Sequence, residues 1–534
     1  TSEALPDRDP AALPPEARER QAVLRLPSGS SLRARLIGAG PPVVLLHESP
    51  RSSVALLPLA RRLAPRFACL CLDSPGYGLS DPLPMDRPEV PDLAAVVIEA
   101  MDALDLPPAP VYGTHTGAAL AAAAADLAPG RVTAAVLDGY AAFTPAEQAE
   151  LLASYLPPFR PSLDGSHVAW LWARVRDQFT AFPWNRVSDA CRLAAGPPPL
   201  AVLQAVVDDV LLAGDHYRTG YAAAFRYDHL APLRRARVPM RVACRADDPL
   251  LPHMERVRGV GARTTLHALP ADRDLWGGAL AGLLAPAATG PWTSAADLAR
   301  AAAPLAGDRR LVETSAGPVA VRMEGPETGS NTVLLCDVPG GMDARDGLAA
   351  RLARAGRRVI RADLPGLGAS RLAPGAAPTV ETMATGLGEA LAALGAGAAP
   401  VIAEGAALAV AARLAPRPLV LLDPWPAVAE GVAEAVPDLA PRWDGAHLSA
   451  AWWWARDAAV HKPWTHRVNA EGREIGPERD AARVHADFRA IVVSGEAGAA
   501  LAAALYRAAP AAEVPAGTPV VLAANDPDAG TLAA

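Results

Sequence analysis

The stretch Gly113-Thr114-His115-Thr116-Gly117 decides how this sequence is interpreted. It has the frame of the G-x-S-x-G nucleophile elbow, in which a strand turns sharply into a helix and exposes a strained central side chain. Histidine stands in the place of the serine. The flanks agree, since residues 110–112 form a short apolar run and residues 118–127 an alanine-rich helical pattern. The pentapeptide alone also suits a plain turn whose histidine caps a helix, so the surrounding order of elements has to decide.

Composition and charge exclude several classes of protein. A length of 534 residues with 51% hydrophobic residues predicts two domains. The net charge of -7 argues against a nucleic-acid surface, which needs clustered Lys and Arg. The alanine-rich runs at 118–125 and 406–412 are shorter than the ~20 apolar residues that a membrane span needs. We therefore expect neither nucleic acid nor membrane as a partner, and a small molecule as the substrate.

The N-terminal segment and the cysteines point to the cytoplasm and to a site without cofactors. Residues 1–21 are proline-rich and charged without an apolar core, which predicts a loose arm and no signal peptide. The five cysteines show no C-x-x-C or metal spacing, and we expect them to be reduced and no metal to be bound. No G-x-G-x-x-G follows the first strand, so we expect no nucleotide cofactor.

Strand and helix patterns alternate through the first half of the chain. Two short strands precede the apolar run 43–46, which predicts a buried parallel strand, and residues 67–72 predict another. The second strand ends in the turn Asp73-Ser-Pro-Gly-Tyr-Gly-Leu-Ser80. Such alternation predicts an α/β fold built on a mostly parallel, doubly wound sheet.

Three stretches in this order resemble the α/β-hydrolase superfamily: residues 47–53, the turn at 73–80 and the elbow at 113–117. The resemblance covers residues 22–285 and implies a helical cap inserted after the sixth strand, at about 141–232, where tryptophan-rich helical patterns interrupt the alternation. Asp248 matches the position of the family's acid. The place of the family's catalytic histidine holds Arg273 and Asp274, so the chain departs twice from the serine-histidine-acid pattern.

His115 is the candidate catalytic residue, either as a nucleophile or as a base. Glu48 stands where the family usually has glycine, and its carboxylate could hydrogen-bond His115 and fix the tautomer. Asp138 and Asp248, both at carboxyl ends of predicted strands, are the other candidates to orient the ring.

An oxyanion hole is expected beside His115. Its amides would come from Thr116 and from either Glu48 or Ser49. A carbonyl oxygen that gains negative charge would be held there during bond cleavage.

An internal repeat predicts a second, degenerate domain. The turn at 73–80 recurs at 363–370, and at the second elbow Gly405 stands opposite His115, so no nucleophile remains. The counterpart of Asp248 falls at Asp526, near the end of the sequence, which predicts a truncated sheet. We expect a linker at 286–310 and a second hydrolase-like domain at 311–534 with a cap at about 425–515. The two domains would form an intramolecular pseudo-dimer, with a homo-oligomer as an open alternative.

Residues of the two predicted caps also repeat. Asp164-Gly165-Ser166-His167, Trp172 and Trp184 recur as Asp444-Gly445-Ala446-His447, Trp452 and Trp464. The structural interpretation is that the aspartate caps a helix and the tryptophans pack it. In the functional interpretation His167, Trp172 and Trp184 line the roof of the pocket and select a flat or apolar substrate. Both interpretations stay open.

The resemblance favours a cofactor-independent enzyme that cleaves an ester, a thioester or a C–C bond of a small apolar carbonyl compound through His115. One alternative is a lyase, decarboxylase or isomerase that uses His115 as a base. Another is a ligand-binding protein without catalysis. Convergence of His115, Glu48 and one of Asp138 or Asp248 on an enclosed pocket would favour an enzyme. Scattered carboxylates or a filled pocket would favour the binding protein.

Overall fold

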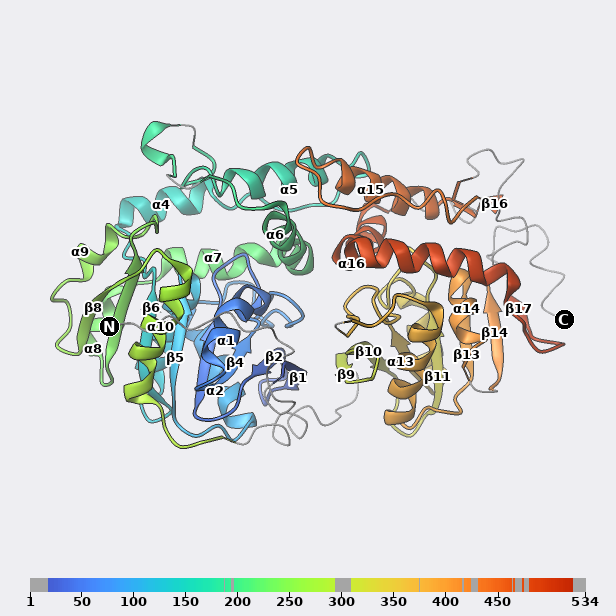
Figure 1. Cartoon of the computed structure of the whole chain (residues 1–534), viewed down its shortest axis with the longest axis horizontal. Helices are drawn as coiled ribbons and strands as arrows, with labels where there is room; N and C mark the ends of the chain where they lie inside the picture. The colour runs from blue at the N-terminus through green and yellow to red at the C-terminus, as the bar shows by residue number, and fades with distance from the viewer. Residues whose placement is uncertain are drawn as a thin grey trace. The chain divides into compact units, whose positions relative to one another are not determined.

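The computed structural model divides into two compact units, residues 1–160 with 173–303 (unit 1) and residues 161–172 with 304–534 (unit 2) (Figure 1). The residues that the structure describes are 18–186, 188–193, 196–292, 309–373, 375–414, 417–423, 431–462, 464–465, 473–474 and 480–521. Most of the predicted N-terminal arm and linker, parts of the second cap and the counterpart of Asp248 lie outside them.

Unit 1 is built on a mixed sheet of eight strands in the order β1-β2-β4-β3-β5-β6-β7-β8. The strands are β1 Arg20–Arg25, β2 Ser31–Ile37, β3 Pro42–Leu46, β4 Ala68–Leu72, β5 Ala109–Thr114, β6 Val132–Asp138, β7 Met240–Arg245 and β8 Thr264–Leu269. Strands β3 to β8 pair in parallel, whereas β1 and β2 are antiparallel to their neighbours. The prediction of an α/β fold with a mostly parallel sheet is confirmed.

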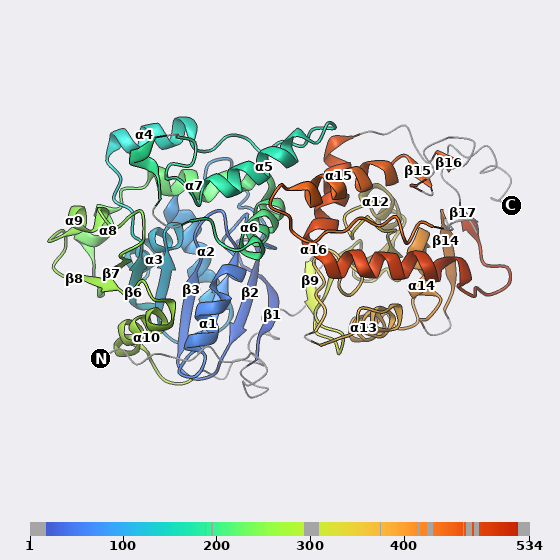
Figure 2. The same ribbon diagram turned by 45° about the horizontal axis from the view of Figure 1, so that its top comes forward.

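Helices cover both faces of this sheet. They are α1 Leu57–Leu63, α2 Val90–Ala103, α3 Thr116–Leu127, α9 His253–Val257 and α10 Arg273–Leu284. Val44 and Leu46 of β3 pack into one core with α2 and α3, and Val43 and Leu45 pack into another with α1 and α10. Figure 2 shows α1 and α10 together on one face. Because alternate side chains of β3 enter opposite cores, the strand is apolar throughout its length.

A helical segment separates β6 from β7. It contains α4 Pro145–Ser154, α5 Ser166–Asp177, α6 Leu200–Ala213, α7 Tyr217–Arg226 and α8 Leu230–Arg235. The first half of α5 belongs to unit 2 and its second half to unit 1. Sequence patterns placed helices here but gave no sign that one of them is shared between the units.

The repeated Asp-x-Pro-Gly turn is a structural clamp. The Asp73 carboxylate is buried and accepts a hydrogen bond from the Leu79 N–H at 3.0 Å. A Cβ on Gly78 would lie 2.0 Å from Asp73 Oδ2, so only glycine fits there. Asp363 and Gly368 have the same relationship, with a Cβ at 2.4 Å. The same arrangement of a buried carboxylate and a glycine therefore occurs in both units.

Unit 2 contains a second sheet in the order β17-β14-β13-β11-β12-β10-β9. Its strands are β9 Arg309–Val312, β10 Val319–Glu324, β11 Ser330–Leu335, β12 Arg357–Ala362, β13 Val401–Glu404, β14 Leu419–Leu422 and β17 Val520–Val521. This order reproduces β1 to β7 of unit 1, one strand for one strand. Within the described part of unit 2, no strand corresponds to β8.

Helices of unit 2 are α12 Asp346–Arg354, α13 Val380–Ala393, α14 Leu408–Ala411, α15 Ala446–Ala458 and α16 Ala481–Ala508, and β15 His461–Lys462 pairs with β16 Arg473–Glu474. The long red helix of Figure 1 is α16, which breaks at Gly495 (φ 62°, ψ -153°). By length and composition alone, Ala481–Ala511 could cross a membrane, but half of its apolar window is buried inside the protein. A buried core helix passes the same test.

The repeated cap residues contact one another inside unit 2. The ring of His167 lies 4.6 Å from that of Trp452, and the ring of His447 lies 5.2 Å from that of Trp172. Both contacts are edge-on. Asp164 accepts a hydrogen bond from the Ser166 N–H, at the start of α5. The motif therefore packs reciprocally against its own repeat, which favours the structural interpretation of these residues.

Candidate active site

His115 lies at the turn between β5 and α3 with a left-handed backbone, φ 47° and ψ -108°. A non-glycine residue in this region stores strain of roughly 1 to 3 kcal/mol. The flanking glycines make the turn possible, because a Cβ on Gly113 would lie 2.0 Å from Gly117 O and one on Gly117 would lie 2.3 Å from Leu46 O. The structure thus has the sharp strand-to-helix turn that the pentapeptide predicts.

Asp248 holds the His115 ring. Its Oδ2 lies 2.8 Å from His115 Nε2, and its Oδ1 accepts a hydrogen bond from the Leu250 N–H. The Asp248 side chain is 1% exposed and that of His115 34% exposed. Since Asp248 occupies Nε2, Nδ1 is the ring nitrogen left for a ligand. Of the three carboxylates that the sequence proposed, this is the one that orients the ring.

The close pairing changes both protonation equilibria. Burial disfavours the charged form of His115, but the charge and hydrogen bond of Asp248 outweigh it and raise the His115 pKa to about 9. Burial likewise opposes ionisation of Asp248, yet His115 lowers the pKa of that carboxyl to about 2. At neutral pH the pair is therefore an imidazolium with a carboxylate.

Gly139 makes room for this pair and was not singled out from the sequence. A Cβ at this position would lie 2.3 Å from His115 Cδ2 and 3.1 Å from Asp248 Oδ2. Its φ of 61° also favours glycine. A glycine directly after a strand that ends in Asp138 is a common turn signal, so the sequence alone could not reveal this contact.

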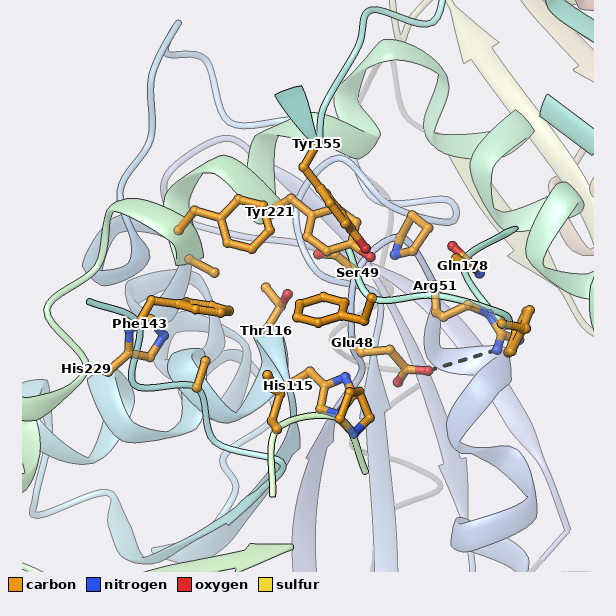
Figure 3. A pocket seen from close by; sticks show the side chains of 18 of the residues that line it. Glu48, Ser49, Arg51, His115, Thr116, Phe143, Tyr155, Gln178, Tyr221 and His229 are labelled. Carbon is orange, nitrogen blue, oxygen red and sulfur yellow. Dashed lines mark ion pairs between the residues drawn. The ribbon is translucent and has the colours of Figure 1, made fainter. Parts of the chain in front are cut away.

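His115 opens onto a cavity of about 210 Å³ whose walls are mostly apolar (Figure 3). The lining residues are Glu48, Ser49, Pro50, Arg51, His115, Thr116, Ala141, Phe143, Tyr155, Gln178, Phe179, Phe182, Leu193, Tyr221, Ala224, Phe225, His229, Pro249 and Leu250. Figure 3 shows Tyr155 and Tyr221 across the cavity from His115, with Arg51 and Gln178 on one side. An apolar cavity with a few polar groups on its wall is typical of a small-molecule site.

Glu48 lines the same cavity, but it does not hold His115. Its carboxylate lies 3.9 Å from Arg51 Nη1, the ion pair drawn in Figure 3. The described residues show no hydrogen bond between Glu48 and the His115 ring, so Glu48 does not fix the tautomer. The longer side chain of glutamate carries the carboxylate toward Arg51, which is itself held by Asp209 at 2.7 Å.

Asp138 lies behind the elbow and outside the lining of the cavity. Its carboxylate accepts hydrogen bonds from Tyr112 Oη at 2.9 Å and from Trp276 Nε1 at 3.3 Å. Burial raises the pKa of this carboxyl. Among the described residues, Asp138 and His115 share one hydrogen bond, which the His115 main-chain N–H donates to the Asp138 main-chain oxygen. Asp138 therefore supports the backbone of the turn and does not orient the ring.

Arg245 joins the two buried carboxylates, a role that no motif indicated. Its Nη2 lies 3.6 Å from Asp248 Oδ2 and its Nη1 lies 3.7 Å from Asp138 Oδ2. The guanidinium also lies over the ring of Trp276, 5.6 Å from its centre. This arrangement places a positive charge beside the Asp248 carboxylate, at the end of β7, three residues before Asp248.

The residues expected to form the oxyanion hole line the cavity. Thr116 is the first residue of α3, so its amide N–H has no partner within the helix and is available to an anion. Ser49 lines the cavity as well, and its hydroxyl donates to Tyr77 Oη at 2.8 Å. Their amides remain the proposed donors.

The three residues that were expected to bind substrate lie elsewhere. His167 and Trp172 pack inside unit 2, and Trp184 donates its Nε1–H to the Tyr155 main-chain oxygen at 3.1 Å. None of the three is among the described residues that line the cavity. The aromatic wall comes instead from other residues, including Tyr221 and Phe225, four positions apart on one face of α7. That spacing was a signal the sequence offered.

In unit 2, the side chain of Asp337, which follows β11, fills the space beside the corresponding turn. Gly405 has a φ of 52°, and the amide N–H of Ala406 donates to Asp337 Oδ1 at 2.8 Å. The same oxygen accepts the N–H of Val338. A Cβ on Gly405 would lie 1.8 Å from Asp337 Oδ2. The Asp337 carboxylate thus binds the amide of Ala406, the counterpart of the Thr116 amide that is expected to hold an oxyanion in unit 1.

Comparison with known proteins bears on unit 1. Residues 41–255 match the family model described as alpha/beta hydrolase fold. This segment is similar to the α/β-hydrolase fold family. Similar solved structures include epoxide hydrolase A from Mycobacterium thermoresistibile, 20% identical with a TM-score of 0.37 over 47% of this chain and 91% of that one. The enol-lactonase from Burkholderia xenovorans LB400 is 19% identical with a TM-score of 0.37, over 46% of this chain and 90% of that one.

Unit 1 matches the α/β-hydrolase sequence pattern at the position of the acid and departs from it at the elbow and after β8. Asp248 follows β7, and the helix α10 after β8 carries Asp274, which pairs with Arg62 at 3.0 Å. Among the described residues, no cluster of three or more His, Cys, Asp or Glu is arranged to hold a metal. Unit 1 therefore has an acidic residue, Asp248, where the resemblance predicts one, and a histidine at the elbow position where the sequence pattern has serine.

Proposed function

We propose that unit 1 is a cofactor-independent enzyme that cleaves an ester, thioester or C–C bond beside the carbonyl group of a small apolar compound. One observation carries this proposal: His115 is held in a strained backbone conformation by a turn that points it, paired with Asp248, into an apolar cavity. Strain of this kind persists only where the surrounding structure enforces it, and it concentrates at functional sites.

The protonation of His115 suggests its role. With a pKa of about 9, only about 1% of the histidine is neutral at pH 7, so a nucleophile or a base at this position would be scarce. The imidazolium is instead suited to donate a hydrogen bond from Nδ1 to a carbonyl oxygen, together with the Thr116 amide. Glu48, on the same cavity wall, is the group suited to accept a proton from water.

Hydrolysis would then proceed in balanced steps. Water loses a proton to Glu48 while its oxygen bonds to the carbonyl carbon, and the oxyanion is held by His115 and Thr116. When the intermediate collapses, the bond to the leaving group breaks and the leaving group takes a proton from His115. The Glu48 proton returns to His115 through solvent, which restores the starting state.

A second candidate is an isomerase, decarboxylase or other lyase. The absence of serine or cysteine at the elbow and the protonated state of His115 favour it. The same imidazolium would stabilise an enolate after Glu48 removes a proton from a carbon next to the carbonyl. No oxygen atom from water is incorporated into the product of this reaction.

The two candidates are separated by turnover in H₂¹⁸O and in D₂O. Small neutral esters and ketones are incubated with the full-length protein, with His115→Ala, and with His267→Ala as a control on β8. Incorporation of ¹⁸O that falls about 10²- to 10⁴-fold in His115→Ala supports hydrolysis. Deuterium exchange next to the carbonyl without ¹⁸O supports the second candidate. If compounds bind but none of them is turned over, the hypothesis of a ligand-binding protein without catalysis is left.

The second sheet suggests an origin for the whole chain. The shared strand order and the repeated Asp73 and Asp363 clamps support a tandem duplication, with hydrolase-like domains at 22–285 and 311–534. Asp337, bound to the amide of Ala406, is the reason to assign no catalysis to the second domain. In this proposal the two domains form a cytoplasmic pseudo-dimer.

A further inference from the structure

The cavity of unit 1 is walled by aromatic rings that support one another. Tyr155 contacts Phe182, Tyr221 and Phe225 with ring centres 6.0, 5.6 and 5.5 Å apart, and Phe143 contacts Phe225 at 5.6 Å. All four pairs meet edge to face. Rings held in this way present fixed faces and edges to the space between them, which favours a flat aromatic ligand over a flexible chain.

The volume of the cavity limits the size of that ligand. An apolar cavity of about 150 Å³ accommodates a benzene ring. The cavity here measures about 210 Å³, so it has room for one ring and a substituent of a few atoms. A second ring or a long acyl chain would not be enclosed. The substituent has to reach His115 and Thr116, where a carbonyl oxygen can be bound.

The charges around the cavity argue against an ionised ligand. Arg51 and the His115 imidazolium are positive, and each is paired with a carboxylate, Asp209 and Asp248. Glu48 adds a further negative charge on the wall. An anion would meet this excess negative charge, and a cation would meet Arg51 and the imidazolium. No charged side chain of the lining is left as a dedicated partner for either.

We infer that the substrate of unit 1 is an uncharged compound with a single aromatic ring next to a carbonyl group. This inference rests on the proposed function and narrows it, because it disfavours charged thioesters of large carriers. The ring lies among Phe143, Tyr155 and Phe225, and the carbonyl oxygen faces His115 Nδ1 and the Thr116 amide.

Four probes of similar size test this inference on the full-length protein by isothermal titration calorimetry. Acetophenone is the neutral aryl ketone, benzoate is its anionic counterpart, phenyltrimethylammonium is a cation with the same ring, and 2-octanone is a linear ketone with the same number of heavy atoms. We expect acetophenone to bind at least tenfold more tightly than each of the others. If another probe matches it, or if acetophenone does not bind, the inference is overturned.

Histidine-selective NMR locates the site without any substitution. Acetophenone should shift the ring signals of His115 and leave those of His267 on β8 unchanged; shifts confined to other histidines contradict the inference. Ala224→Leu narrows the cavity and should weaken acetophenone binding about tenfold, whereas Ala222→Leu, on the same helix but outside the lining, should not. If Ala224→Leu does not fold, the NMR result decides.

Turnover measurements separate this inference from the proposed function. Tight binding of acetophenone without turnover of methyl benzoate would leave the ligand class in place and remove the hydrolase proposal. Turnover of an aliphatic ester such as hexyl acetate, without binding of acetophenone, would support the hydrolase proposal and overturn the inferred ligand class.

Discussion

His115 and Gly405 adopt the same left-handed backbone angle, φ 47° and 52°, at the turns that follow β5 and β13. Glycine takes this conformation without strain, whereas a residue with a Cβ does not. The turn of unit 2 therefore has no backbone strain at this position, whereas the turn of unit 1 is strained. The difference is expected if the side chain at 115 is needed for something other than folding.

This relationship predicts an unusual order of stabilities. His115→Gly and His115→Ala both lose the pair with Asp248, but only glycine relieves the backbone strain. We expect His115→Gly to have a free energy of unfolding about 1 kcal/mol higher than that of His115→Ala. Urea denaturation followed by circular dichroism measures both. Equal stabilities would mean that the turn relaxes when the histidine is removed.

The pH dependence of activity follows from the ion pair. A pKa of about 9 keeps His115 protonated through neutral pH. Activity that depends on the imidazolium should be retained below pH 9 and should fall about tenfold per pH unit above it. A rise in the rate toward pH 9 would instead identify neutral His115 as the nucleophile or base. Initial rates between pH 6 and 10.5, on a substrate without groups that titrate, distinguish the two.

Arg245 is predicted to tune this equilibrium. Removing the positive charge that lies 3.6 Å from Asp248 should leave that carboxylate free to stabilise the imidazolium more strongly. Arg245→Met should therefore raise the His115 pKa by up to about one pH unit. Arg241→Met, on the same strand and bonded to the Leu283 carbonyl, is the matched control. Titration of the His115 NMR signal is the measurement, and an unchanged pKa would refute the role of Arg245.

Gly139 is predicted to be indispensable to the geometry of the pair. Gly139→Ala introduces a Cβ 2.3 Å from His115 Cδ2, so the ring must move and activity should fall by about 10²-fold or more. Gly214→Ala provides the control, because its φ of 56° imposes similar strain while a Cβ there meets nothing within 4 Å. Both variants should lose stability through backbone strain, Gly139→Ala more because of the overlap with His115, but only Gly139→Ala should lose activity. Equal activities would show that the site tolerates movement of the ring.

Local patterns were enough to predict the α/β fold. Apolar strand runs, the glycine-rich turn at 73–80 and the elbow at 113–117 each depend on a few neighbouring residues, and the structure has all three. The sequence could not choose among Glu48, Asp138 and Asp248 as the partner of His115. That choice depends on how the ends of β3, β6 and β7 meet within one or two ångströms, and spacing along the chain does not encode such distances.

The aromatic wall escaped prediction for a related reason. Phe143, Phe182 and Tyr221 come from segments far apart in the sequence, and tertiary packing alone brings them to one cavity. Because His167 and Trp172 recur, they were predicted as pocket residues, but in the structure they pack against Trp452 and His447. Recurrence indicated a shared structural need, whereas the residues of the cavity occur once.

The carboxylate of Asp337 also limits the evolutionary paths open to this chain. Any side chain introduced at Gly405 would begin 1.8 Å from Asp337 Oδ2, so a nucleophile cannot be placed there by one substitution. Asp337 would have to change first, and that first change would leave the amides of Val338 and Ala406 without their partner. Each of these substitutions is thus unfavourable on its own. Point mutation therefore does not readily place a reactive side chain at this turn.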